Sequence, residues 1–362
     1  MITLETGVIR SRNNYDLIRL IAALMVVLGH SFILFSPNGY TDPVKAGLKW
    51  DYSGSIAVYI FFFLSGIFIT ASFINTKAVW RFALMRVVRI WPALVCCVLV
   101  TVFLVGPVFS GLPLKAYLTN SLTRGYLAHN LFLYNIRYEL PGVFTRNYYP
   151  VAVNGSLWTL PVELRCYLAV FVLGLAGLFK RPFLTFIVYA GITVLFFTDN
   201  KYYTQWGGGA QFIFFIAGSF AYCIRNYVYL DLKLWLAAVA LCVPCYFISE
   251  SVFRPVFYIV LMYSVTYAGT TAIARRINLP GDYSYGIYIY GFLVQQIIAA
   301  IWPHLTSLQS MLITMPLVIA IGILSWHFVE SPMLNFGKNF RRARTIADKD
   351  PAETSQKIST RS

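Results

Sequence analysis

The chain has 362 residues, of which 58% are hydrophobic and only 12% are charged, and its formal net charge at pH 7 is +15. Soluble domains carry about 25% charged residues, so this composition excludes an ordinary water-soluble core and favours a protein that lies in lipid. The positive charges fall between apolar segments and near the C-terminus, so no nucleic-acid partner is expected.

The apolar segments are long enough to cross a bilayer as helices. Runs of roughly 20 apolar residues mark such helices, because backbone groups in lipid must be paired within their own segment. The short alternating segments of a membrane β-barrel are not seen. The sequence predicts an all-α integral membrane protein with about ten transmembrane helices, near residues 17–36, 54–74, 90–110, 157–178, 183–198, 208–224, 232–249, 255–273, 284–302 and 309–329.

Lys and Arg residues in the loops predict how these helices are oriented. With the N-terminus in the cytoplasm, the cytoplasmic loops collect more of these residues than the longer loops on the other side. An even number of helices then places both termini in the cytoplasm. We expect a transmembrane domain over residues 1–336 and a basic, disordered cytoplasmic tail over residues 337–362.

The first of three groups of ionisable residues lies on the first helix. Such residues are costly inside a membrane and are therefore candidates for function. Arg19 and His30 are eleven residues apart, which places them within about 20° of one helix face with a rise of about 16 Å between them. Asp16 lies one turn before Arg19 on that face. The alternative is a structural Asp16–Arg19 ion pair and a structural histidine.

The second group is Arg86 and Arg89, one turn apart at the cytoplasmic entry of the third helix. Guanidinium groups pair bidentately with phosphate, so this pair suits a phosphate-bearing ligand. The alternative interpretation is that the two arginines only anchor the helix at the cytoplasmic surface.

The third group surrounds Glu163, on a helix that begins near Asn154 or Ser156. Glu163 is then roughly 9 Å from the outer surface, and His30 is about 20 Å from the inner end of its own helix. These similar depths predict that the imidazole and the carboxylate meet in one low-dielectric pocket, as a base and its orienting partner. A structural Glu163 paired with an arginine is the alternative.

These groups together resemble the motifs of the acyltransferase-3 family of bacterial membrane acyltransferases, over about residues 14–332. Arg19 and His30 match an Arg-x10-His motif, and Arg86 and Arg89 match an Arg-x2-Arg motif. Further similarity lies in residues 61–70, 156–163, 284–288 and 329–332. The resemblance is to members without a C-terminal esterase-like domain.

The resemblance implies transfer of an acyl group, usually acetyl, from a cytoplasmic acyl-CoA to a hydroxyl of an extracytoplasmic or lipid-linked sugar. The implied location is the bacterial inner membrane, with the lipid bilayer as a partner. Acetyl-CoA enters as a co-substrate, no permanently bound cofactor is implied, and no metal-ligand set is visible in the sequence.

Roles for individual residues follow from the predicted depths and from the resemblance. His30 is expected to act as a general base on the sugar hydroxyl, or alternatively to carry the acyl group itself. The full expected set is His30 and Glu163 in catalysis; Arg19, Arg86, Arg89 and Asp16 in donor binding; and Trp158, Ser65 and Tyr285 in acceptor binding or support of the site.

A transporter or flippase of a lipid-linked saccharide is the competing functional hypothesis, because such proteins also place Arg, Glu and His inside their helices. Transporters often show two halves with matching interrupted helices. The sequence shows no such correspondence. Release of coenzyme A that requires His30 distinguishes the enzyme from the transporter.

Overall fold

The computed structural model describes residues 1–35, 41–76, 78–150, 152–198 and 209–347, and these residues are mostly helical. The two strands in this described part, β1 (Ile2–Thr3) and β2 (Tyr229–Leu230), form one short antiparallel pair. An all-α membrane protein is therefore confirmed as the fold class.

The predicted apolar segments are all helical. Within the described residues, seven segments are long and apolar enough to cross a membrane. Three shorter apolar helices, α10 (Pro182–Thr198), α12 (Gly209–Cys223) and α13 (Leu232–Ile248), coincide with the other predicted segments. The seven segments are Tyr15–Leu34, Ser53–Ile74, Val79–Phe109, Gly155–Leu175, Glu250–Thr270, Ser284–Ile301 and Ser307–Phe340.

Individual elements within and between these segments have the following bounds. The longer helices are α2 (Tyr15–Leu34), α4 (Ser53–Ile74), α5 (Val79–Val100), α8 (Ser121–Leu131), α9 (Thr159–Leu175), α14 (Glu250–Thr270), α16 (Ser284–Ile301), α17 (Ser307–Ser325) and α18 (Ser331–Ala347). The shorter ones are α1 (Leu4–Gly7), α3 (Pro43–Leu48), α6 (Gly106–Phe109), α7 (Leu114–Thr119), α15 (Ala272–Arg276), the 3-10 turns η1 (Arg10–Arg12), η3 (Gly155–Trp158) and η4 (Leu178–Lys180), and the π-turns η2 (Thr101–Val105) and η5 (Trp326–Glu330).

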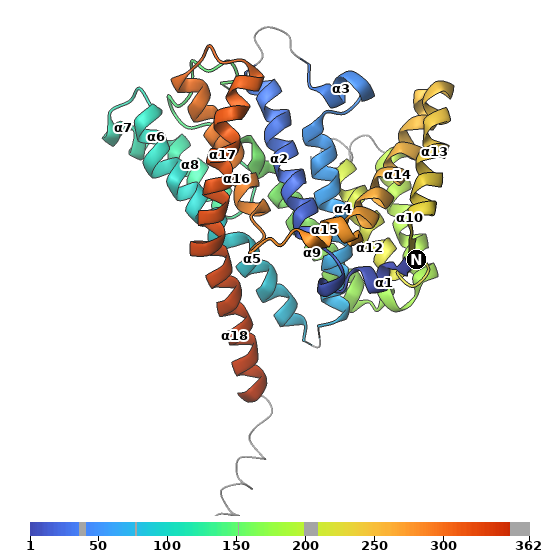
Figure 1. The fold of residues 1–362 in the computed structure, drawn as a ribbon. Coiled ribbons are helices and arrows are strands. Elements are labelled where there is room, and N and C mark those ends of the chain that lie inside the picture. The colour runs from blue at the N-terminus through green and yellow to red at the C-terminus, as the bar shows by residue number, and fades with distance from the viewer. Residues whose placement is uncertain (36–40, 77, 151, 199–208, 348–362) are drawn as a thin grey trace, which may run out of the picture.

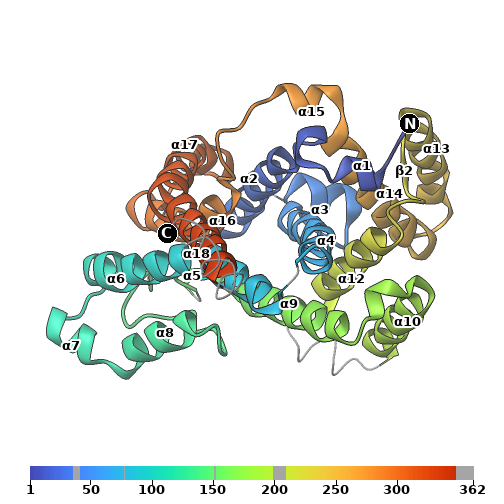
Figure 2. The same cartoon turned by 90° about the horizontal axis from the view of Figure 1, so that it is seen from below.

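Seen along the helices, α2, α4, α5, α9 and α16 surround the middle of the bundle (Figure 2). Helices α13 and α14 lie at one lateral side of the bundle, and α7 and α8 lie at the opposite lateral side. We call the end of the bundle at which α2 begins the N-terminal face, and the other end the opposite face. Helix α18 extends beyond the N-terminal face as a separate rod (Figure 1).

Helices α4 and α12 approach each other closely because each carries a glycine at their contact. A Cβ atom at Gly66 would overlap the carbonyl oxygen of Phe215, and one at Gly218 would overlap that of Phe63. Small residues allow such close backbone packing in membranes, where no hydrophobic force drives helices together. This contact holds α4, which lines the functional site, against the bundle.

Two π-turns widen long helices, and each ends two residues before a proline. Turn η2 ends at Val105, before Pro107, and η5 ends at Glu330, before Pro332. A proline has no N–H group and its ring clashes with the carbonyl four residues earlier, which favours a wider turn at that point. In η5 this turn carries Glu330, which is buried in the bundle.

The predicted boundary of the tail differs from the structure. Helix α18 continues to Ala347, so the first part of the predicted disordered tail, from residue 337, is helical. An amphipathic run in this segment includes Phe336 and Phe340, whose rings stack with centroids 6.2 Å apart. Residues 348–362 lie outside the described part of the chain.

Substitution of Gly218 by alanine should destabilise the bundle, because its Cβ atom would overlap the Phe63 carbonyl oxygen. Overpacking of this kind costs about 1–3 kcal/mol. Gly191→Ala is the matched control, since a Cβ atom there meets nothing within 4 Å. We expect the thermal unfolding midpoint in detergent to fall for Gly218→Ala and not for Gly191→Ala; equal midpoints would contradict the packing assignment.

Candidate functional site

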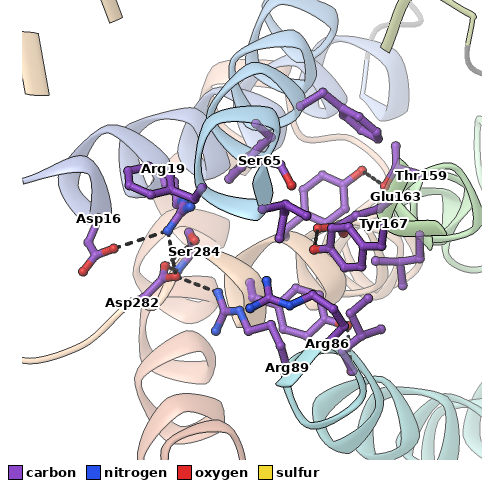
Figure 3. Close-up of a pocket in the computed structure, with 18 of the residues that line it drawn as sticks. Asp16, Arg19, Ser65, Arg86, Arg89, Thr159, Glu163, Tyr167, Asp282 and Ser284 are labelled. Atoms are coloured by element: carbon purple, nitrogen blue, oxygen red, sulfur yellow. Dashed lines mark hydrogen bonds and ion pairs between the residues drawn. The ribbon is translucent and has the colours of Figure 1, made fainter. Parts of the chain in front are cut away.

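A cavity of about 350 Å³ lies among the central helices. Its walls come from α2, α4, α5, α9, α16 and α18, and it reaches the N-terminal face at Arg10 of η1. Charged, polar and aromatic side chains line it, and the polar ones come from several sides (Figure 3).

Seven of the nine site residues predicted from the sequence line this cavity. Trp158 instead ends turn η3 and packs, half-buried, against the main core, which is consistent with a supporting role. His30 is also absent from the cavity wall. The seven lining residues are Asp16, Arg19, Ser65, Arg86, Arg89, Glu163 and Tyr285.

Arg89 is held by two carboxylates from distant parts of the chain. Its Nη2 atom donates to Asp282 Oδ2 at 2.6 Å, and its Nη1 atom donates to Glu330 Oε2 at 3.0 Å. The second oxygen of Glu330 accepts from Ser325 Oγ at 2.9 Å. Both Nη atoms of this guanidinium group therefore bind carboxylates, so Arg89 fastens α5 to the start of α16 and to η5.

Asp282 lies just before α16 and forms ion pairs with arginines from two helices. Arg19 Nη1 approaches its Oδ2 atom at 3.8 Å, and Ser284 Oγ donates to its Oδ1 atom at 2.5 Å. Burial alone would raise the pKa of this carboxyl, but Arg89, Arg19 and the hydrogen bonds from Ser284 outweigh burial and lower it. Asp282 is therefore an anion that organises both arginines.

Arg86 differs from Arg89, although the two lie one turn apart on α5. Within the described part of the chain no carboxylate forms an ion pair with Arg86, and its buried Nε atom has no hydrogen-bond partner. Its guanidinium carbon lies 5.6 Å from the ring centroids of both Phe82 and Tyr167. The two predicted arginines thus differ: Arg89 is paired with two carboxylates, whereas Arg86 has no ion pair among the described residues and lies beside Tyr167 and Glu163.

Glu163 lies deep in the cavity, on the first full turn of α9. The phenol of Tyr167, one turn later on the same helix, donates a hydrogen bond to its Oε1 atom. Both side chains line the cavity together with Arg86 (Figure 3). A carboxylate, a phenol and an unpaired guanidinium therefore face the same space.

The mouth of the cavity carries a looser ion cluster. Asp16 lies 3.5 Å from Arg19 Nη1 and 3.7 Å from Arg10 Nη2. Arg19 also lies over the ring of Phe68, with its guanidinium carbon 5.0 Å from the centroid. The predicted contact of Asp16 with Arg19 is present, and Arg19 additionally reaches Asp282.

His30 lies beyond the inner end of the cavity, towards the opposite face. Its ring packs edge-on against Phe292 at 5.0 Å between centroids, and its buried Nδ1 atom has no hydrogen-bond partner among the described residues. A Cβ atom on the preceding Gly29 would meet the Gly54 backbone nitrogen at 2.7 Å, and one on Gly155 would meet the Phe292 ring at the same distance. His30 is therefore level with Gly54, Phe292 and Gly155.

On all three neighbouring helices, the cavity wall begins one helical turn away from the level of His30. Val58, Tyr288 and Thr159 line the cavity, and each is four residues from Gly54, Phe292 or Gly155, on the side of the N-terminal face. One turn corresponds to a rise of about 5.4 Å. The cavity thus stops about one turn short of His30.

The predicted meeting of His30 with Glu163 is not what the structure shows. Glu163 is four residues beyond Thr159, so it lies about two turns from the level of His30. The prediction of equal depth was wrong because it located the outer membrane surface at residue 154. In the structure, the segment before Thr159 is a loop followed by a 3-10 turn, and this segment is buried inside the bundle near the opposite face.

Several residues of the site were missed by reasoning from the sequence. Tyr167 could have been found as a phenol one turn after a buried glutamate. Glu330 was noted only as part of a weak motif, yet a buried acid in a membrane helix needs a cation, and that cation is Arg89. Asp282 gave no local signal, because its importance depends on contacts with two distant helices.

Comparisons with known proteins agree with the motifs. A family model described as an acyltransferase domain matches residues 12–327. A protein of Shigella phage Sf6 named O-acetyl transferase is 29% identical over 349 residues, which cover 89% of this chain and 96% of that protein. Nodulation protein 10 of Rhizobium leguminosarum bv. viciae is 29% identical over 349 residues, covering 89% of this chain and 93% of that protein. No solved structure matches the chain.

Replacement of Arg89 by alanine should destabilise the protein, because it leaves the buried carboxylate of Glu330 without its cation and leaves Asp282 only the 3.8 Å contact with Arg19. Breaking a buried ion pair on one side costs about 3–5 kcal/mol. Arg86→Ala removes an equally long side chain from the same helix without breaking an ion pair, and is the control. Thermal unfolding in detergent should show a lower midpoint for Arg89→Ala alone; a similar loss in both variants would contradict the division between them.

Proposed function

The chain belongs to the acyltransferase family and is an O-acyltransferase, and on this premise we propose that it moves an acetyl group from cytoplasmic acetyl-CoA to a hydroxyl of an extracytoplasmic or lipid-linked saccharide. The acetyl group is suggested by the name of the phage relative, an O-acetyl transferase. The saccharide follows from the resemblance of the motifs. Family membership favours this activity over the transporter hypothesis.

The proposed topology has ten membrane-crossing helices, both termini in the cytoplasm, and a bacterial inner membrane as its location. The N-terminal face is then cytoplasmic, and residues 337–362 continue from the transmembrane domain (1–336) into the cytoplasm. Exposed arginines on that face support this orientation under the positive-inside rule. They include Arg10, Arg12, Arg275 and Arg276.

The cavity is proposed to receive the thioester arm of the donor. Small-molecule sites commonly enclose about 300–1,000 Å³, so 350 Å³ suits an extended arm better than a whole nucleotide thioester. The arm enters past Asp16 and Arg19 at the mouth. Arg86 then offers the unpaired guanidinium for the phosphate nearest the arm, while Arg89 keeps the wall in place.

His30 is proposed to be the general base. Its imidazole takes the proton of the saccharide hydroxyl, the resulting oxygen nucleophile attacks the thioester carbonyl, and the carbon–sulfur bond breaks. The released coenzyme A thiolate takes up the proton, so the products are the O-acetylated sugar and free coenzyme A. The unpaired Nδ1 atom of His30 supports this role, because a buried polar atom without a partner is costly unless a ligand uses it.

Glu163 is proposed to act at the donor end of the reaction. It does not contact His30, so it cannot orient the imidazole as first expected. The hydrogen bond from Tyr167 and the nearby Arg86 fix its carboxylate beside the path of the thioester arm. Ser65 and Tyr285 shape the same wall, and Tyr285 donates to the Ile90 carbonyl at 2.9 Å.

One observation carries the proposal: a charged cavity enters from one face and ends about one turn from a buried imidazole near the other. Aromatic side chains meet where the cavity ends: Phe61 and Tyr288 line it and contact each other, and Phe292 packs against His30 one turn further on. The acceptor then approaches from the opposite face, and these side chains must rearrange for the acyl carbon to reach His30.

The deciding experiment supplies purified protein in detergent with labelled acetyl-CoA and a saccharide fraction from the host surface. The proposal expects release of free coenzyme A together with labelled saccharide. Sugar movement across vesicles without any acyl turnover would instead establish the transporter hypothesis.

His30→Ala should abolish acetyl transfer, because the carboxylates among the described lining residues lie about two turns or more from the level of His30 and cannot replace it as the base. Its abundance and elution on size exclusion should stay close to those of the unchanged protein. Loss of folding in this variant would show that the histidine is structural.

Arg86→Ala should raise the KM for acetyl-CoA, by about tenfold for the loss of one charge-assisted hydrogen bond, with a smaller effect on kcat. Initial rates at varied donor concentration measure both constants. An unchanged KM would remove Arg86 from donor binding.

A further inference from the structure

Most of the charges that line the cavity neutralise one another. Four arginines line it, Arg10, Arg19, Arg86 and Arg89, and so do the three carboxylates of Asp16, Glu163 and Asp282. Arg89 is also bound to Glu330, which lies outside this lining. Of the four arginines only Arg86 has no ion pair among the described residues. A donor that carries several phosphates therefore needs positive charge elsewhere to hold the others.

Such charge lies around the cavity mouth, on the N-terminal face. Met85 of α5 and Leu334 of α18 line the cavity. Arg81 and Lys338 each lie four residues further towards that face on the same two helices, and residues four apart share a helix side. The two helices pack together here, because a Cβ atom at Gly337 would lie 3.0 Å from Val88.

Arg10 completes this group from the other side of the mouth. Its side chain lines the cavity and is 92% exposed, with only a 3.7 Å contact to Asp16. Within the described residues, no carboxylate pairs with Arg81 or Lys338, and the buried Nε atom of Arg81 has no hydrogen-bond partner. The Arg81 guanidinium carbon lies 5.4 Å from the ring centroid of Trp80. We call Arg10, Arg81 and Lys338 the basic rim.

We propose that the basic rim binds the remaining phosphate groups of the donor's nucleotide outside the cavity, while the thioester arm and the phosphate nearest to it occupy the interior. This inference rests on the proposed function. Arg81 and Lys338 have no carboxylate partner among the described residues, whereas three of the four arginines that line the cavity are paired with acids. Guanidinium and ammonium groups at the mouth also attract the anionic donor before it enters.

Headgroups of anionic lipids share the phosphate chemistry and are the rival occupant. The position of the rim favours the nucleotide, because Arg10 lines the cavity and Arg81 and Lys338 lie one turn beyond the cavity-lining Met85 and Leu334. A lipid-binding surface needs no cavity between its basic residues.

The test compares two donors in vesicles of neutral lipid: acetyl-CoA, and S-acetyl-pantetheine, which has the arm but no nucleotide. Arg81→Gln and Lys338→Gln should each raise the KM for acetyl-CoA by about three- to fivefold, as expected for exposed charge pairs. The KM for S-acetyl-pantetheine should not change. Arg181→Gln, an exposed arginine on the same face but away from the mouth, is the matched control and should leave both values unchanged.

Salt gives a second measurement of the same contact. Because exposed charges are screened, the KM for acetyl-CoA should rise with ionic strength in the unchanged protein and rise less in the double variant Arg81→Gln/Lys338→Gln.

Three outcomes would overturn the inference. The rim variants could leave the KM for acetyl-CoA unchanged, or they could weaken both donors equally. They could also alter activity only when anionic lipid is added, which would assign the rim to the membrane. If the unchanged protein turns over neither donor, the proposed function fails as well, and that result is distinct from all three.

Discussion

The pairing of Arg89 with Asp282 and Glu330 is the constraint on which the rest of the site depends. It joins three segments that are far apart along the chain, because Asp282 follows Arg89 by 193 residues and Glu330 follows it by 241 residues. Ionised groups are tolerated inside a membrane protein when they satisfy one another. Arg89 occupies these two carboxylates, and Arg86 is the interior arginine to which the proposed function assigns a phosphate of the donor.

The positions of the helices could be predicted from the sequence, because lipid requires long apolar runs and internal backbone pairing. Seven of the nine predicted site residues also converge on one cavity. The relative depths of His30 and Glu163 could not be predicted, because depth depends on where each helix begins. The partners of Arg89 were equally hidden, since no spacing in the sequence connects it with Asp282 or Glu330.

The cavity opens on the N-terminal face of the bundle, whereas His30 lies towards the opposite face. Under the proposed function, the charged cavity serves the donor side and the imidazole of His30, beside Phe292, serves the acceptor side. This separation suits an enzyme whose two substrates come from opposite compartments, because an open path between them would let water reach the thioester. The aromatic side chains of Phe61, Tyr288 and Phe292 lie where the cavity ends.

Helix α18, the last described element, supplies Leu334 to the wall of the cavity, and η5 just before it supplies Glu330 to Arg89. Both contacts need residues 330–334, which a ribosome makes after the other helices of the cavity wall. During biosynthesis those helices therefore enter the membrane with an incomplete cavity and an unfastened Arg89. A chain shortened before Glu330 should lack both contacts.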